Sequence, residues 1–218
     1  PDEFKRKVLD GLQLAYKITA NSLYGQIGAP TSQIYFKDIA ACTTATGRKL
    51  LYYAKDFTEN IYKPEYKVPF MTNEGEEVYI QGGKCVYGDT DSIFTKFTIT
   101  DKDDNHIRGK RGLEISIQIG VDLGVQISKG MKPPHDLEYE KTFWPFCLFS
   151  KKRYVGNLYE TDPNSYSLKS MGIVLKRRDN APVVKYVFGG IIDIILNEKD
   201  IEKSVLFCKE AVNKMFEG

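Results

Sequence analysis

The chain has 218 residues, 42% of them hydrophobic and 12% aromatic, so it can bury the core of one large domain or two small ones. Its formal net charge of +2 does not mark a nucleic-acid binder, and any basic surface has to come from local clusters. Four scattered cysteines without a C-x-x-C pair argue against a zinc site and a disulfide scaffold, and they favour a reducing, intracellular compartment. No apolar run approaches the roughly 20 residues of a membrane span, and no signal peptide is recognisable. Because the chain starts in a charged segment without methionine, we interpret it as a piece of a longer protein.

Apolar periodicity and turn residues predict a mixed α/β part followed by an all-helical tail, with a boundary near residues 172–182. Helices are expected over 3–24, 37–60, 113–131, from Val183 on and over 201–216, and strands on both sides of Asp89-Thr90-Asp91 and over 137–140, 143–149 and 152–158. The stretch 63–83 is rich in proline and glycine, so we expect it to be rich in loops.

The segment Tyr87-Gly88-Asp89-Thr90-Asp91-Ser92 places two carboxylates two residues apart between apolar runs. Such a pattern is typical of a β-hairpin with its turn at the Gly-Asp step. Paired aspartates at a hairpin tip suit Mg²⁺, which takes oxygen ligands and keeps substrate phosphates in its shell. The alternative interpretation is a solvated turn without a function.

A polar stripe runs along the first predicted helix, where Gln13, Lys17, Asn21 and Tyr24 follow one another at intervals of four, four and three residues. At about 100° per residue these side chains share one face of a helix. A lysine acts as a point charge on phosphate, and a tyrosine beside a glycine offers a stacking face. The alternative is an ordinary solvated helix face.

Three motifs together resemble those of family B DNA polymerases. Lys17–Gly25 resembles the K-x-x-x-N-S-x-Y-G signature of the fingers helix, Tyr87–Ser92 the Y-G-D-T-D-S signature of the palm, and Lys151–Tyr154 the K-K-R-Y signature. They occur in the family's order, cover nearly the whole chain and are most similar to the delta-like enzymes of eukaryotes and large DNA viruses. The resemblance implies an α+β fold with an antiparallel palm sheet backed by helices. It implies fingers over 1–34, palm over 35–170 and the start of a helical thumb over 171–218.

The resemblance also implies roles for single residues around the nucleotide. Lys17 is similar to the lysine that meets the triphosphate, Asn21 to a pocket-lining asparagine, and Tyr24 with Gly25 to the pair that packs against the nascent base pair. Asp91 resembles the aspartate that binds both catalytic metal ions, and Asp89 resembles its weaker or indirect partner. Thr90, between them, is expected to shape the turn and is counted among the nucleotide-binding residues.

Further residues are expected to hold DNA. Lys152 resembles the lysine that contacts the primer terminus, with Lys151, Arg153 and Tyr154 supporting the duplex. The basic run Lys176-Arg177-Arg178 is similar to the segment leading into the thumb, and the alternative is a solvated cluster. It follows Met171-Gly172, where family members often have Lys-Gly. Glu138 and Glu140 alternate on a predicted strand and share a face near the metals, unless they form a structural salt bridge.

The implied reaction is template-directed addition of deoxynucleotides to a primer 3′-end by two-metal phosphoryl transfer with Mg²⁺. Implied partners are primer–template DNA, deoxynucleoside triphosphates and a sliding clamp or accessory subunits, in the nucleus or at a viral replication site. The family's upstream D-x-x-S-L-Y-P-S segment, which carries the other metal-binding aspartate, is not in this sequence. We therefore expect these 218 residues alone to be inactive.

Two alternatives stay open. A nucleotidyl cyclase also uses paired palm carboxylates, but it should lack the Lys17–Tyr24 stripe and the Lys151–Tyr154 signature, which are present. A non-catalytic, polymerase-like nucleic-acid-binding module is compatible with the missing upstream segment. It predicts that Asp91→Asn changes nothing measurable.

Overall fold

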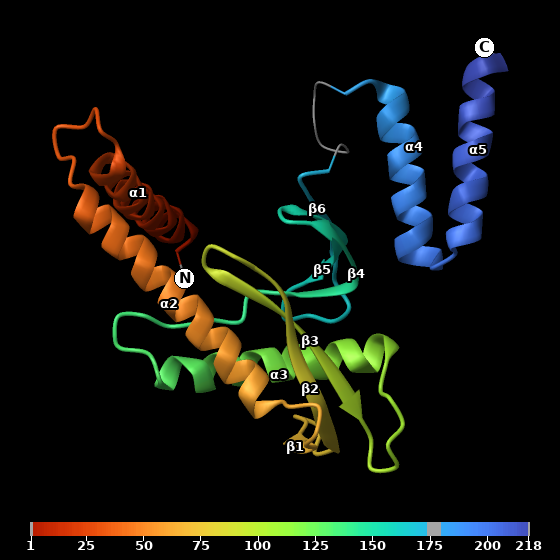
Figure 1. Ribbon diagram of the computed structural model, residues 1–218, viewed down its shortest axis with the longest axis horizontal. Coiled ribbons are helices and arrows are strands. Elements are labelled where there is room, and N and C mark those ends of the chain that lie inside the picture. The colour runs from red at the N-terminus through yellow and green to blue at the C-terminus, as the bar shows by residue number, and fades with distance from the viewer. Residues whose placement is uncertain (1, 174–179, 218) are drawn as a thin grey trace. The chain divides into compact units, whose positions relative to one another are not determined.

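The computed structural model describes residues 2–173 and 180–217, and these divide into two compact units, Pro1–Tyr53 and Ala54–Gly218 (Figure 1). The division falls inside the second helix. We describe each unit by itself. The expected assignment of fingers, palm and thumb to ranges of the chain stays a prediction.

The first unit holds helix α1, Glu3–Gly28, and the first part of helix α2, Lys37–Ile61. Asp2 caps α1 by accepting a hydrogen bond of 3.1 Å from the Phe4 N–H. The predicted end at residue 24 is too early, since Gly25 stays helical. The helix ends where Ala29 adopts an extended conformation before Pro30, as expected of a residue that precedes proline. No side chain of α1 is buried.

The second unit contains two three-stranded antiparallel sheets, which confirms the predicted α+β class. The first sheet consists of β1 (Val68–Met71), β2 (Glu77–Asp89) and β3 (Ser92–Thr100), and the second of β4 (Thr142–Ser150), β5 (Arg153–Tyr159) and β6 (Ser167–Met171). The strand order is β1-β2-β3 in one sheet and β4-β5-β6 in the other.

The loop-rich stretch 63–83 also contains strand segments that were not expected, β1 and the start of β2. Pro69 is tolerated in β1 because that strand lies at the sheet edge, where a missing N–H costs no ladder bond. Gly82, with φ of +103°, lies where the β2–β3 register shifts between Ile80 and Gly83. The glycine signal therefore marked a bulge rather than a loop.

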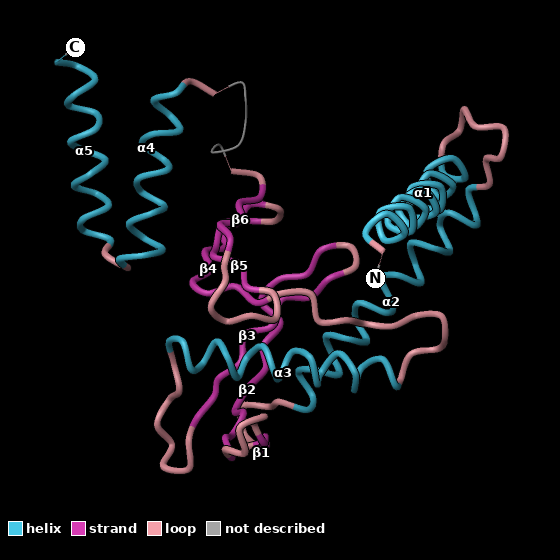
Figure 2. The backbone as a smooth tube through the Cα atoms, turned by 180° about the vertical axis from the view of Figure 1, so that it is seen from behind, coloured by secondary structure: helices cyan, strands magenta, loops and turns pink. Residues whose placement is uncertain are grey.

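Helix α3, Gly109–Lys129, crosses the strands of the first sheet in both views (Figures 1 and 2). It begins four residues before the predicted start, since Gly112 is already helical and buried. Its buried side chains are mainly isoleucine and leucine, so core packing outweighs the low helix propensity of β-branched residues. The buried apolar residues are Leu113, Ile115, Ile117, Ile119, Leu123 and Ile127.

An aromatic cluster joins the two sheets. Its centre is Phe94 on β3, whose ring centroid lies 5.5 to 5.9 Å from those of Phe143, Phe146 and Tyr154 of the second sheet. Tyr87 on β2 lies 5.3 Å from Phe94 and 6.0 Å from Tyr154. Such ring pairs contribute beyond their buried area, so this cluster holds the two neighbouring hairpins together.

The C-terminal helices α4 (Pro182–Asp193) and α5 (Ile201–Glu217) lie side by side in both views (Figures 1 and 2). A π-helical turn, Ile194–Glu198, follows α4 and contributes Leu196 to a buried cluster with Ile192 and Val155. Proline at the first position of α4 is compatible with a helix start. Within the described ranges, no helix has the length and apolar character needed to cross a membrane.

Candidate active site

The tip of the β2–β3 hairpin carries the two predicted metal-binding aspartates. Asp89 ends β2 and pairs with Ser92 at the start of β3, so the turn consists of Thr90 and Asp91 alone. The Asp91 N–H donates to the Asp89 carbonyl oxygen at 2.6 Å, and the Ser92 hydroxyl donates to the same oxygen at 3.2 Å. Thr90 has a φ of +51°, which agrees with the predicted role of this residue in shaping the turn.

Asp89 is surrounded by donors. Its Oδ1 atom accepts a hydrogen bond from the Thr90 hydroxyl at 3.1 Å and lies 3.3 Å from the Lys152 Nζ atom, and its Oδ2 atom accepts from the Tyr87 hydroxyl at 3.2 Å. Burial raises the pKa of Asp89, but the hydrogen bonds from Lys152, Thr90 and Tyr87 outweigh it and hold the pKa below its usual value. This carboxylate is therefore ionised and already paired with a cation.

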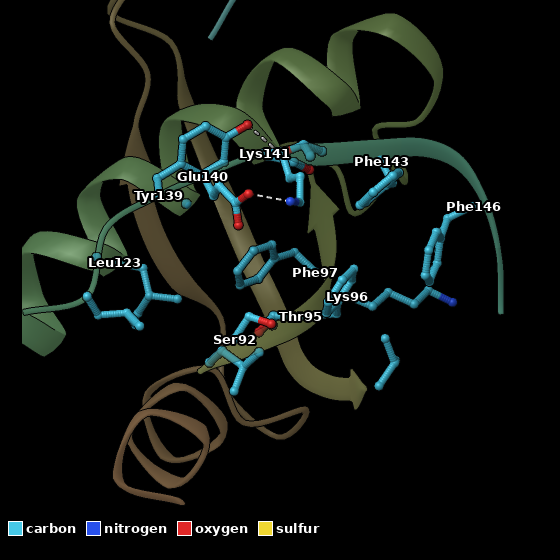
Figure 3. A pocket seen from close by; sticks show the side chains of 18 of the residues that line it. Ser92, Thr95, Lys96, Phe97, Leu123, Tyr139, Glu140, Lys141, Phe143 and Phe146 are labelled. Atoms are coloured by element: carbon cyan, nitrogen blue, oxygen red, sulfur yellow. Dashed lines mark hydrogen bonds and ion pairs between the residues drawn. The ribbon is translucent and has the colours of Figure 1, made fainter. Parts of the chain in front are cut away.

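Asp91 differs from Asp89. It is exposed, and no hydrogen bond or ion pair with another described residue engages its carboxylate. It lines a cavity of about 660 Å³ between β3, α3 and the segment 137–146 (Figure 3). A carboxylate that lines an open cavity and has no partner among the described residues can bind a cation.

Glu138 and Glu140 line the same cavity, but the predicted strand over 137–140 is wrong. The Ser128 hydroxyl donates to the Leu137 carbonyl at 3.0 Å and accepts from its N–H at 2.8 Å, so a side chain replaces a neighbouring strand as partner. Gly124 leaves room for this segment, since a Cβ atom there would lie 3.0 Å from the Leu137 carbonyl oxygen.

Glu140 forms an ion pair with Lys141, as the dashed line in Figure 3 shows. This contact agrees with the salt-bridge alternative for that residue. Over the described part of the chain, no three histidine, cysteine, aspartate or glutamate side chains gather closely enough to hold a metal ion. The donor set suits a hard cation through Asp91, because Mg²⁺ uses one or two carboxylates and completes its shell with substrate phosphates and water.

The tip of the β4–β5 hairpin carries the K-K-R-Y residues. Lys151 and Lys152 form the turn between Ser150 and Arg153, and these two lysines and Arg153 are exposed. Tyr154 is only 9% exposed because its ring belongs to the aromatic cluster. Three cations at one tip can attract a phosphate backbone. That these three residues and Tyr154 hold DNA stays a prediction.

Of the predicted nucleotide-binding residues, Thr90 lies in the β2–β3 turn, and the others lie on α1 in the first unit. Lys17 and Asn21 are exposed, and the Tyr24 hydroxyl shares a hydrogen bond of 2.9 Å with the Thr44 hydroxyl of α2. A Cβ atom on Gly25 would meet nothing within 4 Å, so the surface beside Tyr24 is open. This face can accept a flat ligand, but its position opposite Asp91 stays a prediction. The basic run Lys176, Arg177 and Arg178 lies outside the described residues.

Comparison with known proteins agrees with these motifs. The family model described as DNA polymerase family B matches residues 1–218.

The chain belongs to DNA polymerase family B.

Several DNA polymerases resemble the chain over most or all of its length. A DNA polymerase of Pyramimonas orientalis virus is 54% identical over 217 residues, which is 100% of this chain and 16% of that protein. The DNA polymerase delta catalytic subunit of Caenorhabditis elegans is 36% identical over 98% of the chain and 18% of its own length. A DNA polymerase of Acanthamoeba polyphaga mimivirus is 41% identical over 74% of the chain and 9% of its own length. The chain thus spans less than a fifth of each of these relatives.

Two residues at the hairpin tips were given no role of their own in the sequence interpretation. Tyr87 contacts both Asp89 and the Lys152 backbone, and Gly172 lies against the Lys152 carbonyl group. The first contact had a signal in the sequence, since Tyr87 and Asp89 alternate on one strand and share a face. The second had none, because it depends on how β6 pairs with β5.

Proposed function

We propose that the protein containing this chain is a DNA-directed DNA polymerase, which adds deoxynucleotides to a primer 3′-end under the direction of a template. The observation that carries the proposal is the free Asp91 carboxylate beside a cationic hairpin tip of the same unit. The two tips meet through the 3.3 Å ion pair between Lys152 Nζ and Asp89 Oδ1. A free anion for a metal ion next to cations for DNA is what phosphoryl transfer requires.

Each tip has its own part in this proposal. Asp91 would bind both catalytic Mg²⁺ ions of the two-metal reaction, while Asp89 is engaged by Lys152 and contributes indirectly. When bound, Mg²⁺ supplies Lewis-acid stabilisation of charge on the transferring phosphate. Lys151, Lys152 and Arg153 contact the primer backbone, which gives binding that is independent of sequence and sensitive to salt.

The first unit supplies the incoming nucleotide's site in this proposal. Lys17 neutralises the β- and γ-phosphates, Asn21 lines the pocket, and Tyr24 with Gly25 packs against the new base pair. Base pairing with the template, rather than a side chain, selects the nucleotide. We further propose that the protein acts with a sliding clamp or accessory subunits where the genome is copied. Because Asp91 has too few carboxylate partners, the 218-residue chain is expected to be inactive alone.

The test is primer extension by the full-length protein, wild type against Asp91→Asn, with Mg²⁺ and all four deoxynucleotides. Asparagine preserves the size of the side chain and removes its charge. Metal-ion stabilisation amounts to several kcal/mol, so we expect a loss of about 10³-fold or more. Asp103→Asn, an exposed aspartate in the β3–α3 loop, serves as the matched control and should retain full activity.

Equal extension by wild type and Asp91→Asn would show that the metal site lies elsewhere. A wild type that binds primer–template without extending it would instead support a non-catalytic binding module. A large loss in Asp91→Asn alone would establish the polymerase site.

A further inference from the structure

The Tyr87 hydroxyl lies between the two hairpin tips and binds both of them. It donates a hydrogen bond to Asp89 Oδ2 at 3.2 Å and accepts one from the Lys152 backbone N–H at 3.0 Å. Its ring is packed against Phe94 and Tyr154, so the direction of the hydroxyl is fixed. One phenol thus uses both its donor and its acceptor capacity to join residues of two different sheets.

Lys152 needs such support because its backbone is strained. Its φ is +59°, a left-handed conformation that residues with a side chain rarely adopt. Its side chain returns to the same carboxylate that Tyr87 binds, with Nζ 3.3 Å from Asp89 Oδ1. Asp89, Tyr87 and Lys152 therefore close a ring of three contacts, in which the lysine is held at both its backbone and its ammonium group.

Gly172 lies on the other side of the same lysine. A Cβ atom at this position would lie 2.2 Å from the Lys152 carbonyl oxygen and 3.1 Å from the Arg153 Cγ atom. Gly172 also has a φ of +61° and follows Met171, which pairs with Tyr154. A contact with a backbone oxygen cannot be relieved by a side-chain rotation, so only glycine lets the end of β6 approach the turn this closely.

We propose that Tyr87 and Gly172 are positioning residues for Lys152: they hold its backbone from two sides, so that its ammonium group lies beside Asp89 and faces the primer terminus. The inference rests on the proposed function, because it assigns their effect to primer binding. Neither residue contacts the nucleotide or the metal ion in this scheme. Their substitution therefore changes the KM for primer–template and leaves the KM for deoxynucleotides unchanged.

The test compares Tyr87→Phe and Gly172→Ala with the wild type in steady-state extension by the full-length protein. Tyr87→Phe keeps the packed ring and removes only the hydroxyl. The change removes both hydrogen bonds of the hydroxyl, and the one from the Lys152 N–H is the bond that holds the lysine backbone. Loss of that bond, about 1 kcal/mol, predicts a KM for primer–template about fivefold higher. Gly172→Ala, which forces the turn itself to move, should raise the same KM by about tenfold or more.

Two control variants match these changes. Tyr159→Phe removes a phenol hydroxyl from β5 in the second sheet, and Gly109→Ala introduces a methyl group at a similar φ of +69°, where it would meet nothing within 4 Å. Both controls should keep the wild-type KM for primer–template. If Gly172→Ala fails to fold, the comparison of Tyr87→Phe with Tyr159→Phe decides.

The decisive readout is the effect of Tyr87→Phe in a Lys152→Ala background. In the Lys152→Ala background the ammonium group that Tyr87 is proposed to position is absent. Tyr87→Phe should therefore change the KM for primer–template by less than about twofold in that background. The same fivefold loss in both backgrounds would overturn the inference while leaving the polymerase activity intact. If the wild type does not extend primers, the proposed function fails. The dissociation constant for primer–template, measured on the same variants, then still decides whether Tyr87 acts through Lys152.

Discussion

The β2–β3 and β4–β5 hairpins both turn over two residues, Thr90-Asp91 in one and Lys151-Lys152 in the other. Each turn contains a residue other than glycine with positive φ, Thr90 at 51° and Lys152 at 59°. The support for the two strained residues differs. At the acidic tip it is local, since the Thr90 hydroxyl binds the preceding Asp89 and the Asp91 N–H closes the turn.

At the basic tip the support comes from distant parts of the chain. The Lys152 N–H donates to the hydroxyl of Tyr87, 65 residues earlier, and its carbonyl lies against Gly172. Strained backbone persists where its surroundings determine it. The comparison teaches that the acidic tip can form by itself, while the basic tip depends on the packing of one sheet against the other.

The largest expected effect comes from removing the anchor that both hairpins share. Phe94→Ala deletes the half-buried ring at the centre of the cluster, which we expect to lower the free energy of local unfolding of both hairpins by about 2–3 kcal/mol. Amide hydrogen exchange of the full-length protein measures this opening for each hairpin separately.

Phe216→Ala on α5 is the matched control, because that ring is 86% exposed and its loss should cost less than about 0.5 kcal/mol. If Phe94→Ala loosened only β2–β3, the basic tip would not depend on the cluster, and the contrast between the tips would be wrong.

Asp89→Asn breaks the link between the tips and separates the roles of the two aspartates. Because Asp89 pairs with Lys152 and Asp91 is free, we expect Asp89→Asn to raise the KM for primer–template about tenfold, far less than the loss expected for Asp91→Asn. Steady-state extension with each substrate varied in turn measures this. Equal losses in kcat for both variants would contradict the division of roles.

The pH dependence of Asp89 sharpens the same contrast. Burial raises its pKa, but hydrogen bonds from Lys152, Thr90 and Tyr87 outweigh this and lower it. A carboxyl whose pKa is lower in the folded state stabilises that state above its unfolded pKa, and the contribution is lost as the pH falls through its folded pKa. Because the hydrogen bond from Lys152 lowers the Asp89 pKa, we expect Lys152→Ala to raise it. NMR titration of carboxyl carbons in the chain measures this change.

Lys141→Ala is the control for that titration, because this lysine pairs with Glu140 and is not among the groups that lower the Asp89 pKa. An Asp89 titration that is the same in wild type and Lys152→Ala would mean that the ion pair does not form in solution.

The smallest effect concerns a single phosphate contact. Lys151→Ala should make the slope of log K for primer–template binding against log salt concentration less negative by about 0.9, the value for one released counterion. Fluorescence anisotropy at several salt concentrations measures it. Lys102→Ala changes an exposed lysine in the β3–α3 loop and should leave the slope unchanged. Equal slopes for the wild type and both variants would mean that Lys151 does not contact DNA.

Much of the fold and of the candidate site could be predicted from the sequence, because the signals are local. Helical periodicity places α2 within one residue of its bounds, and the apolar runs beside Gly88 predict the hairpin that carries Asp89 and Asp91. Local signals also misled where they had two interpretations. The prolines and glycines of 63–83 are typical of loops, but at an edge strand and a bulge they are compatible with a sheet.

The sequence by itself determined that this chain belongs to DNA polymerase family B and has an acidic and a basic hairpin, since motifs and turns depend on neighbouring residues. Only the tertiary structure decided that Asp89 is paired and Asp91 free, that Tyr87 joins the two tips, and that Gly172 makes room for Lys152. The physical reason is distance along the chain. Asp89 and Asp91 lie two residues apart, and their charge environments differ only because packing brings a lysine from another sheet to one of them.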